Sequence, residues 1–137
     1  MRPATLAEAV ERTMAGEPRD AALAEFLDTF YLASSSERRF ATLADEPVLT
    51  GDSRLDALAG AMADYLARQY RLPHVPDWAF GPKRFLDRPW HVSPFEGEGM
   101  REFLTFSSPA EFSSRNIFTE ERPLRRARAG LVKASTD

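Results

Sequence analysis

The segment TGDSRLDALAGAMADYLARQY, residues Thr50 to Tyr70, carries the strongest helix pattern in the chain. Asp52 is placed to cap its first turn, because an aspartate side chain can accept from the free backbone N–H groups there. Apolar residues recur at the three- and four-residue spacing of one helix face, and they are Leu55, Leu58, Met62 and Leu66. Alanines and Gly60 flank this stripe. Small side chains at these positions would let neighbouring helices approach closely.

Three more helices are expected ahead of this segment. Thr5 and Glu8 have the spacing of a capping box, which predicts a helix start. A second helix begins near Pro18, and a third spans about residues 34–43, where the proline of Glu46-Pro47 prevents continuation. The second helix has a broad apolar face that must pack on a core; this face consists of Leu23, Phe26, Leu27, Phe30 and Tyr31.

Residues 73–96 have a different composition. They hold five of the 10 prolines and both tryptophans of the chain. No long helix or central strand is compatible with that proline spacing, and the aromatic content is too high for a disordered linker. We therefore expect an ordered, irregular segment anchored by Trp78, Phe80, Phe85 and Trp90. Phe80, Phe85 and one of the two tryptophans are expected to complete the core.

Helical patterns return after this segment. A helix is expected over about residues 98–106, and a short helix follows from Ser108, with Pro109 at its first position. A last short helix is expected from Thr119 onward. Together these patterns predict one all-α domain over residues 1–130. It would be a compact bundle of about six helices, with the irregular Pro/Trp-rich segment between the fourth and fifth, and residues 131–137 would form a flexible tail.

Composition excludes several classes of function. The chain has 137 residues, no cysteine and two histidines, so disulfides and a cysteine nucleophile are excluded and a transition-metal site is not expected. It contains no GxGxxG or GxxxxGK[ST] phosphate-binding loop, and no cofactor is expected. No apolar run is long enough for a membrane span. The N-terminus is amphipathic with early acidic residues, unlike a signal peptide, which makes the cytoplasm the expected location.

The residue types around the two tryptophans favour a partner-binding surface. Tryptophan and arginine dominate interface hot spots, because they bury a large area with little loss of freedom. The expected partner-binding residues are Trp78, Arg84, Arg88, Trp90 and His91. The leading hypothesis is therefore a non-enzymatic interaction module with a protein partner. Its oligomeric state stays open.

Two alternatives remain. Residues 1–70 carry seven basic and twelve acidic residues, which argues against nucleic-acid binding there. The C-terminal region is basic, and it would serve a transcriptional regulator or nucleic-acid accessory protein through Arg122, Arg125, Arg126, Arg128 and Lys133. The third hypothesis is a small enzyme centred on His91, with Asp77 or Asp87 as its orienting carboxylate and Ser93 as nucleophile. The spacing of these residues matches no catalytic motif.

Three stretches give the chain a resemblance to a known family. They are EPVLTGDSRLDALAGAMADYLARQYRLP (46–73), RFLDRPWHVS (84–93) and SPAEFSSRNIFTEERPLRRA (108–127). Over about residues 20–128 this layout is similar to a family of uncharacterised bacterial proteins, in which it often forms the C-terminal part of a helix–turn–helix protein. Members tend to be encoded beside nucleotidyltransferase-like proteins of the AbiEii toxin type. The resemblance implies an antitoxin-like or regulatory partner of such a protein, although no basic helix–turn–helix precedes the shared part here.

Overall fold

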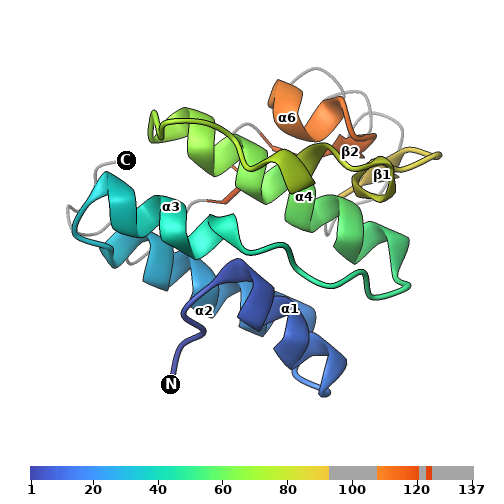
Figure 1. The fold of residues 1–137 in the computed structure, drawn as a ribbon. Coiled ribbons are helices and arrows are strands. Elements are labelled where there is room, and N and C mark those ends of the chain that lie inside the picture. The colour runs from blue at the N-terminus through green and yellow to red at the C-terminus, as the bar shows by residue number, and fades with distance from the viewer. Residues whose placement is uncertain (93–107, 121–122, 125–137) are drawn as a thin grey trace.

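Helix α4 (Ser53–Gln69) is the central element of the computed structural model, which describes residues 1–92, 108–120 and 123–124. The carboxylate of Asp52 accepts hydrogen bonds from the backbone N–H groups of Arg54 and Leu55, so the predicted cap is confirmed. Every residue from Leu55 to Ala67 is buried except Leu58 and Tyr65, which are half buried. A helix covered on nearly every side needs packing elements around it. Figure 1 shows chain on both sides of α4.

Three helices form the layer on one side of α4 (Figure 1). They are α1 (Leu6–Met14), α2 (Arg19–Leu32) and α3 (Ser36–Ala44). The hydroxyl of Thr5 accepts from the backbone N–H of Glu8, and the hydroxyl of Ser35 caps α3 in the same way. The apolar faces of these helices meet α4 in one core, which includes Leu6, Val10, Leu23, Phe26, Leu27, Phe30, Leu43, Met62 and Leu66.

Short elements cover the opposite side of α4. They are the 3₁₀ turns η1 (Asp77–Phe80) and η2 (Pro82–Arg84), the strand β1 (Trp90–His91), the one-turn helix α6 (Ala110–Ser113) and the strand β2 (Ile117–Phe118). The two strands pair in parallel, with Trp90 opposite Ile117 and His91 opposite Phe118. The prediction that the proline-rich segment holds neither a long helix nor a central strand is confirmed within residues 73–92.

The all-α class is confirmed, but the helix count differs from the prediction. Residues 1–92 and 108–120 contain five α-helices, one fewer than expected. The helix predicted over residues 98–106 lies outside the described residues, as does the tail at 131–137. The last predicted helix, from Thr119, is not helical at residues 119–120, and most of it also lies outside the described part.

Gly60 sets the distance between α4 and the irregular segment. A Cβ atom at this position would lie 2.8 Å from the Cβ of Arg84, 3.1 Å from the backbone oxygen of Ala79 and 3.3 Å from Nε of Arg115. Carbon atoms normally pack at about 3.5–4.0 Å, so even a methyl group would push the segment outward. The close approach expected along the small-residue flank of α4 is therefore present. The elements that lie close to it are the 3₁₀ turns η1 and η2, where neighbouring helices were expected.

Candidate functional site

Two buried arginines attach the irregular segment to α4, and Arg84 of η2 is the first. Its side chain is 1% exposed. One terminal nitrogen donates to the backbone oxygen of Pro47 at 2.6 Å and lies 3.4 Å from a carboxylate oxygen of Glu46. The other donates to the backbone oxygen of Asp56 at 3.3 Å. Since a buried guanidinium needs such partners, Arg84 fixes η2 against α4 and the loop before it.

Arg115, which follows α6, is the second buried arginine. Its Nη1 donates to Asp64 at 2.9 Å and to the backbone oxygen of Glu111 at 2.8 Å, while Nη2 donates to the backbone oxygen of Ala79 at 2.7 Å. It thus connects α4, α6 and η1. The second carboxylate oxygen of Asp64 accepts from Nε of Arg68 at 2.6 Å, and this hydrogen bond raises the pKa of Arg68.

Helix α4 meets these arginines through a stripe of three residues spaced four apart: Asp56, Gly60 and Asp64. Residues at this spacing share one helix face. Asp64 binds Arg115, Gly60 leaves room for both arginines, and Asp56 accepts from the backbone N–H and hydroxyl of Thr50. This acid–glycine–acid stripe was missed in the sequence, where the apolar stripe of the same helix dominates the pattern. Its four-residue spacing is the signal that could have revealed it.

Phe80 and Phe85 lie over the buried guanidinium of Arg115. Their ring centres are 5.5 and 4.6 Å from its central carbon, within the range of a cation–π contact. Phe80 and Phe85 remain 47% and 36% exposed as residues. The prediction that both phenylalanines complete the core is therefore wrong. Each side chain covers Arg115 and stays partly exposed to solvent.

An open cleft of about 730 Å³ lies between the start of α4 and the chain that runs from η2 to β1. Its lining residues are Leu49, Gly51, Ser53, Arg54, Asp56, Pro82, Lys83, Phe85, Leu86, Asp87, Arg88 and Pro89. Its lining thus combines apolar side chains, among them the exposed Leu49 and Phe85, with three exposed cations. We refer to five of these residues as the cleft face: Leu49, Arg54, Lys83, Phe85 and Arg88.

Neither tryptophan is among the residues that line this cleft. The indole N–H of Trp78 donates to the backbone oxygen of Leu43 at 2.9 Å, and the guanidinium of Arg84 covers the ring at 4.9 Å. Trp90 has the guanidinium groups of Arg19 and Arg54 over its ring, at 5.4 and 5.1 Å. Both tryptophans are half buried and pack against the hydrophobic core.

A second, smaller cavity of about 240 Å³ has Trp90 in its lining. Its apolar lining comes from α2, α4 and the β1–β2 pair, with Leu27, Met62 and Ile117 among its residues. Trp90 and Val92 belong to this lining. Trp90 lines the smaller cavity, and Arg54, whose guanidinium lies over the Trp90 ring, lines the cleft. The two cavities are therefore neighbours through this contact.

The structure brings together only part of the expected partner-binding set. Arg88 lines the cleft, and Trp90 adjoins it through Arg54. Arg84 was expected at the surface, but it is buried because its guanidinium holds η2 on α4. Trp78 keeps only part of its ring accessible, and His91 lines neither described cavity.

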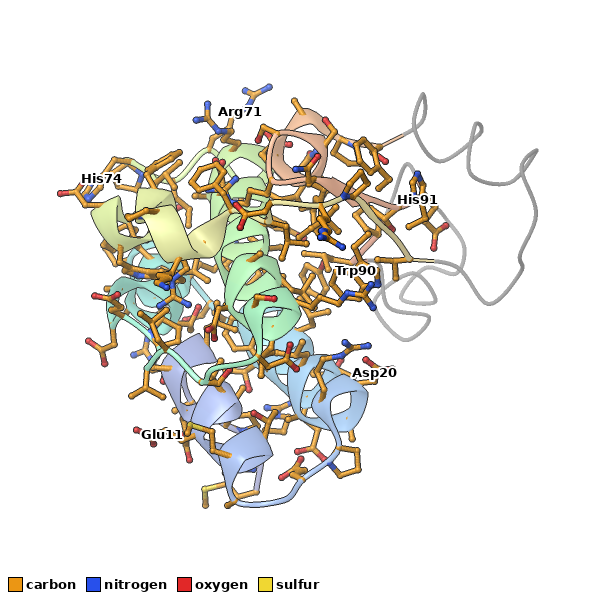
Figure 2. The ribbon with its side chains drawn as sticks, turned by 90° about the vertical axis from the view of Figure 1, so that its right-hand side faces the viewer. Glu11, Asp20, Arg71, His74, Trp90 and His91 are labelled. Carbon is orange, nitrogen blue, oxygen red and sulfur yellow. The ribbon has the colours of Figure 1, made fainter. Side chains whose placement is uncertain are left out.

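The described residues give His91 no orienting carboxylate, which the enzyme hypothesis requires. The imidazole of His91 stacks on the ring of Phe118, with ring centres 5.1 Å apart, and none of the described carboxylates forms an ion pair with it. His74 packs against Phe40 instead. Figure 2 shows the two histidines on opposite sides of α4, so they do not share a site.

Other predicted features are only partly covered by the structure. The basic residues proposed for nucleic acid all lie outside the described residues, namely Arg122, Arg125, Arg126, Arg128 and Lys133. Within residues 1–92, 108–120 and 123–124, no three histidine or carboxylate side chains are grouped as a metal site requires. None of the helices in that part of the chain combines the length and apolar character of a membrane span.

Comparison with known proteins adds no assignment. No family model, no curated protein and no solved structure matches this chain. The similarity to the antitoxin-like family therefore stays a hypothesis that rests on the sequence pattern.

Sequence reasoning named only Arg88 of the five cleft-face residues as a binding residue; it expected Phe85 in the core and missed the other three. Leu49, Arg54 and Lys83 lie on different elements: the loop before α4, its first turn, and η2. Nothing in their local sequence indicates that the fold brings them together. The signal available was weaker. Val48 and Leu49 lie three to four residues before the predicted helix cap Asp52, so two apolar side chains occupy a loop where polar residues are usual.

Proposed function

We propose that the protein is a non-enzymatic protein-interaction module that binds its partner over the cleft face. One observation carries this proposal: an open cleft of about 730 Å³ has half-exposed Leu49 and partly exposed Phe85 beside three cations. Apolar residues surrounded by charged ones are typical of a docking surface. Arginines and aromatic residues are also the types that contribute most to binding free energy.

The buried arginines support the same proposal from beneath the surface. Arg84 and Arg115 attach the irregular segment to α4 through backbone oxygens at 2.6 to 3.3 Å. A surface segment held in this way loses little conformational freedom when a partner binds. The entropy cost of binding is therefore smaller and the affinity is higher. The segment thus offers exposed apolar groups in a fixed geometry.

The specific form of the proposal is an antitoxin-like or regulatory partner of a nucleotidyltransferase-type protein. Its support is the sequence resemblance over about residues 20–128. The mechanism would be steric, because a rigid apolar surface with a cationic rim can cover a site on its partner. No reaction on the cleft face is needed for this function.

A matched pair of leucine variants tests the proposal. The tagged chain is isolated from its host, the co-purifying protein is identified by mass spectrometry, and the complex is reassembled from purified components for calorimetry. Leu49→Ser, in the cleft, should weaken binding by about tenfold or more, the equivalent of about 1.4 kcal/mol. Leu32→Ser is the control, because Leu32 is similarly exposed on α2 and does not line the cleft.

Two outcomes would contradict the proposal. Equal weakening by both leucine variants would place the interface elsewhere. Failure to reassemble any complex, together with retention on DNA or RNA that falls with salt and is lost in Arg125→Ala/Arg126→Ala, would favour the nucleic-acid alternative.

A further inference from the structure

The charged residues of the cleft do not neutralise one another. Arg54, Lys83 and Arg88 are exposed, and none forms an ion pair with a described residue. On the α1–α2 surface, by contrast, Arg12 pairs with Glu8 and Arg19 pairs with Asp20. The cleft therefore presents positive charge that the described part of the protein leaves available for another molecule.

The carboxylates in the cleft lining offset this charge only in part. Asp56 is 5% exposed, and both of its oxygens accept hydrogen bonds from Thr50. Asp87 is the exposed carboxylate of the lining, which also holds three exposed cations. The surface of the cleft that a partner can reach is thus positive on balance, although the whole chain carries a net charge of −3.

The apolar part of the cleft limits what can occupy it. Leu49 and Phe85 supply partly exposed apolar surface beside Pro82, Leu86 and Pro89. A volume of about 730 Å³ is in the range of clefts that hold a molecule of many atoms, and it is far larger than a single anion requires. The cleft therefore suits a group of side chains that are partly apolar and partly negative.

We propose that the cleft binds an acidic segment of a partner protein that inserts one large apolar side chain between Leu49 and Phe85 and places carboxylates against Arg54, Lys83 and Arg88. This inference rests on the proposed function and names the chemistry of the partner. Hydrogen bonds between guanidinium and carboxylate groups are about twice as strong as neutral ones. Clusters of basic residues commonly recognise acidic motifs in this way.

A nucleic acid is the less suitable occupant of the same cleft. A phosphate backbone would match the three cations, but it would leave the apolar side chain of Leu49 against polar groups. An acidic peptide can also carry a large apolar side chain that packs against Leu49 and Phe85.

Peptide selection followed by charge reversal tests the inference. The immobilised full chain is used to select from a random-peptide display library. The selected peptides should share a large apolar residue flanked by aspartate or glutamate. A synthetic peptide of the selected sequence should lose about tenfold or more in affinity for Lys83→Glu and for Arg88→Glu, measured by fluorescence polarisation. Arg38→Glu, an exposed site on α3 with the same change in net charge, should bind as the wild type does.

Each other result would overturn the inference. Selected peptides without an acidic bias, no selected binder at all, or equal losses in all three variants would each exclude an acidic occupant of the cleft. Binding of a single-stranded oligonucleotide that is lost in Lys83→Glu and Arg88→Glu, without peptide binding, would assign the cleft to nucleic acid. If the reassembled partner complex depends on Leu49 but tolerates both charge reversals, the proposed function survives and only the acidic chemistry fails.

Discussion

On one side of α4, the helices α1 to α3 bury apolar side chains such as Phe26 and Phe30, which have no exposed surface. On the other side, η1, η2 and α6 are attached through the guanidinium groups of Arg84 and Arg115. Apolar packing tolerates substitutions of similar size. A buried guanidinium requires particular acceptors at particular positions, and losing one of them leaves a charge unpaired. The fold of the irregular side therefore depends more strictly on the identity of particular residues, although this side has less regular secondary structure.

The largest effect is expected from removing Arg115. Arg115→Ala would leave the carboxylate of Asp64 buried with only Arg68 as partner, and it would free the backbone oxygens of Glu111 and Ala79. Breaking a buried ion pair costs about 3–5 kcal/mol. Chemical denaturation should show a loss of this size in the free energy of unfolding.

The control for this variant is Arg68→Ala. Arg68 binds the same carboxylate from the solvent side, with 57% of its side chain exposed, so its removal should cost about 1 kcal/mol or less. Similar losses in the two variants would mean that burial does not distinguish the two arginines. The irregular side of α4 would then not depend on its buried guanidinium contacts in the way described above.

An intermediate effect is expected at Gly60. Alanine there would favour an isolated helix by up to about 1 kcal/mol. In this fold its Cβ would lie 2.8 Å from the Cβ of Arg84, and overpacking of this kind costs about 1–3 kcal/mol. Gly60→Ala should therefore lower the midpoint of thermal unfolding. A higher midpoint would show that the irregular segment can move outward without loss.

The smallest effect is expected on the helical side, at Glu8. Hydrogen bonds from the backbone N–H of Ala4 and then from Arg12 hold the pKa of Glu8 below its ordinary value of 4.5. A lowered pKa means that the ionised carboxylate stabilises the fold above about pH 4.5, and that this contribution is lost as the pH falls through the lowered pKa. Glu8→Gln should melt slightly below the wild type at pH 7.

The pH profile supplies the control for Glu8. The difference in melting temperature between wild type and Glu8→Gln should shrink as the pH falls below about 4.5 and through the lowered pKa of Glu8, because the wild-type side chain becomes neutral over this range. A constant difference across this range would assign the effect to side-chain shape and not to charge.

The helical side could be predicted from the sequence because its signals are local. Thr5, Ser35 and Asp52 cap helices within three residues of their own positions, and the apolar stripe of α4 repeats within one helix. The ordered but irregular character of residues 73–92 also followed from proline spacing and aromatic content.

The irregular side could be predicted only in part, because its contacts join distant positions. Arg115 meets Asp64 across 51 residues, and Arg84 meets Pro47 across 37. Residue type alone predicted that Arg84 lies in an interface, because a sequence does not distinguish a buried arginine from an exposed one. It also placed Phe80 and Phe85 in the core, because the guanidinium that they cover comes from a later part of the chain.

The four-residue spacing of Asp56, Gly60 and Asp64 makes α4 sensitive to its own length. Each residue turns an α-helix by about 100°, so one residue inserted between Asp56 and Asp64 would rotate the backbone oxygen of Asp56, which accepts from Arg84, by more than a quarter turn relative to the carboxylate of Asp64, which accepts from Arg115. Point substitutions within this span can leave the two guanidinium contacts aligned, whereas an insertion or deletion cannot. Relatives that keep this architecture should therefore vary in the loops and hold the length of α4 constant between these two aspartates.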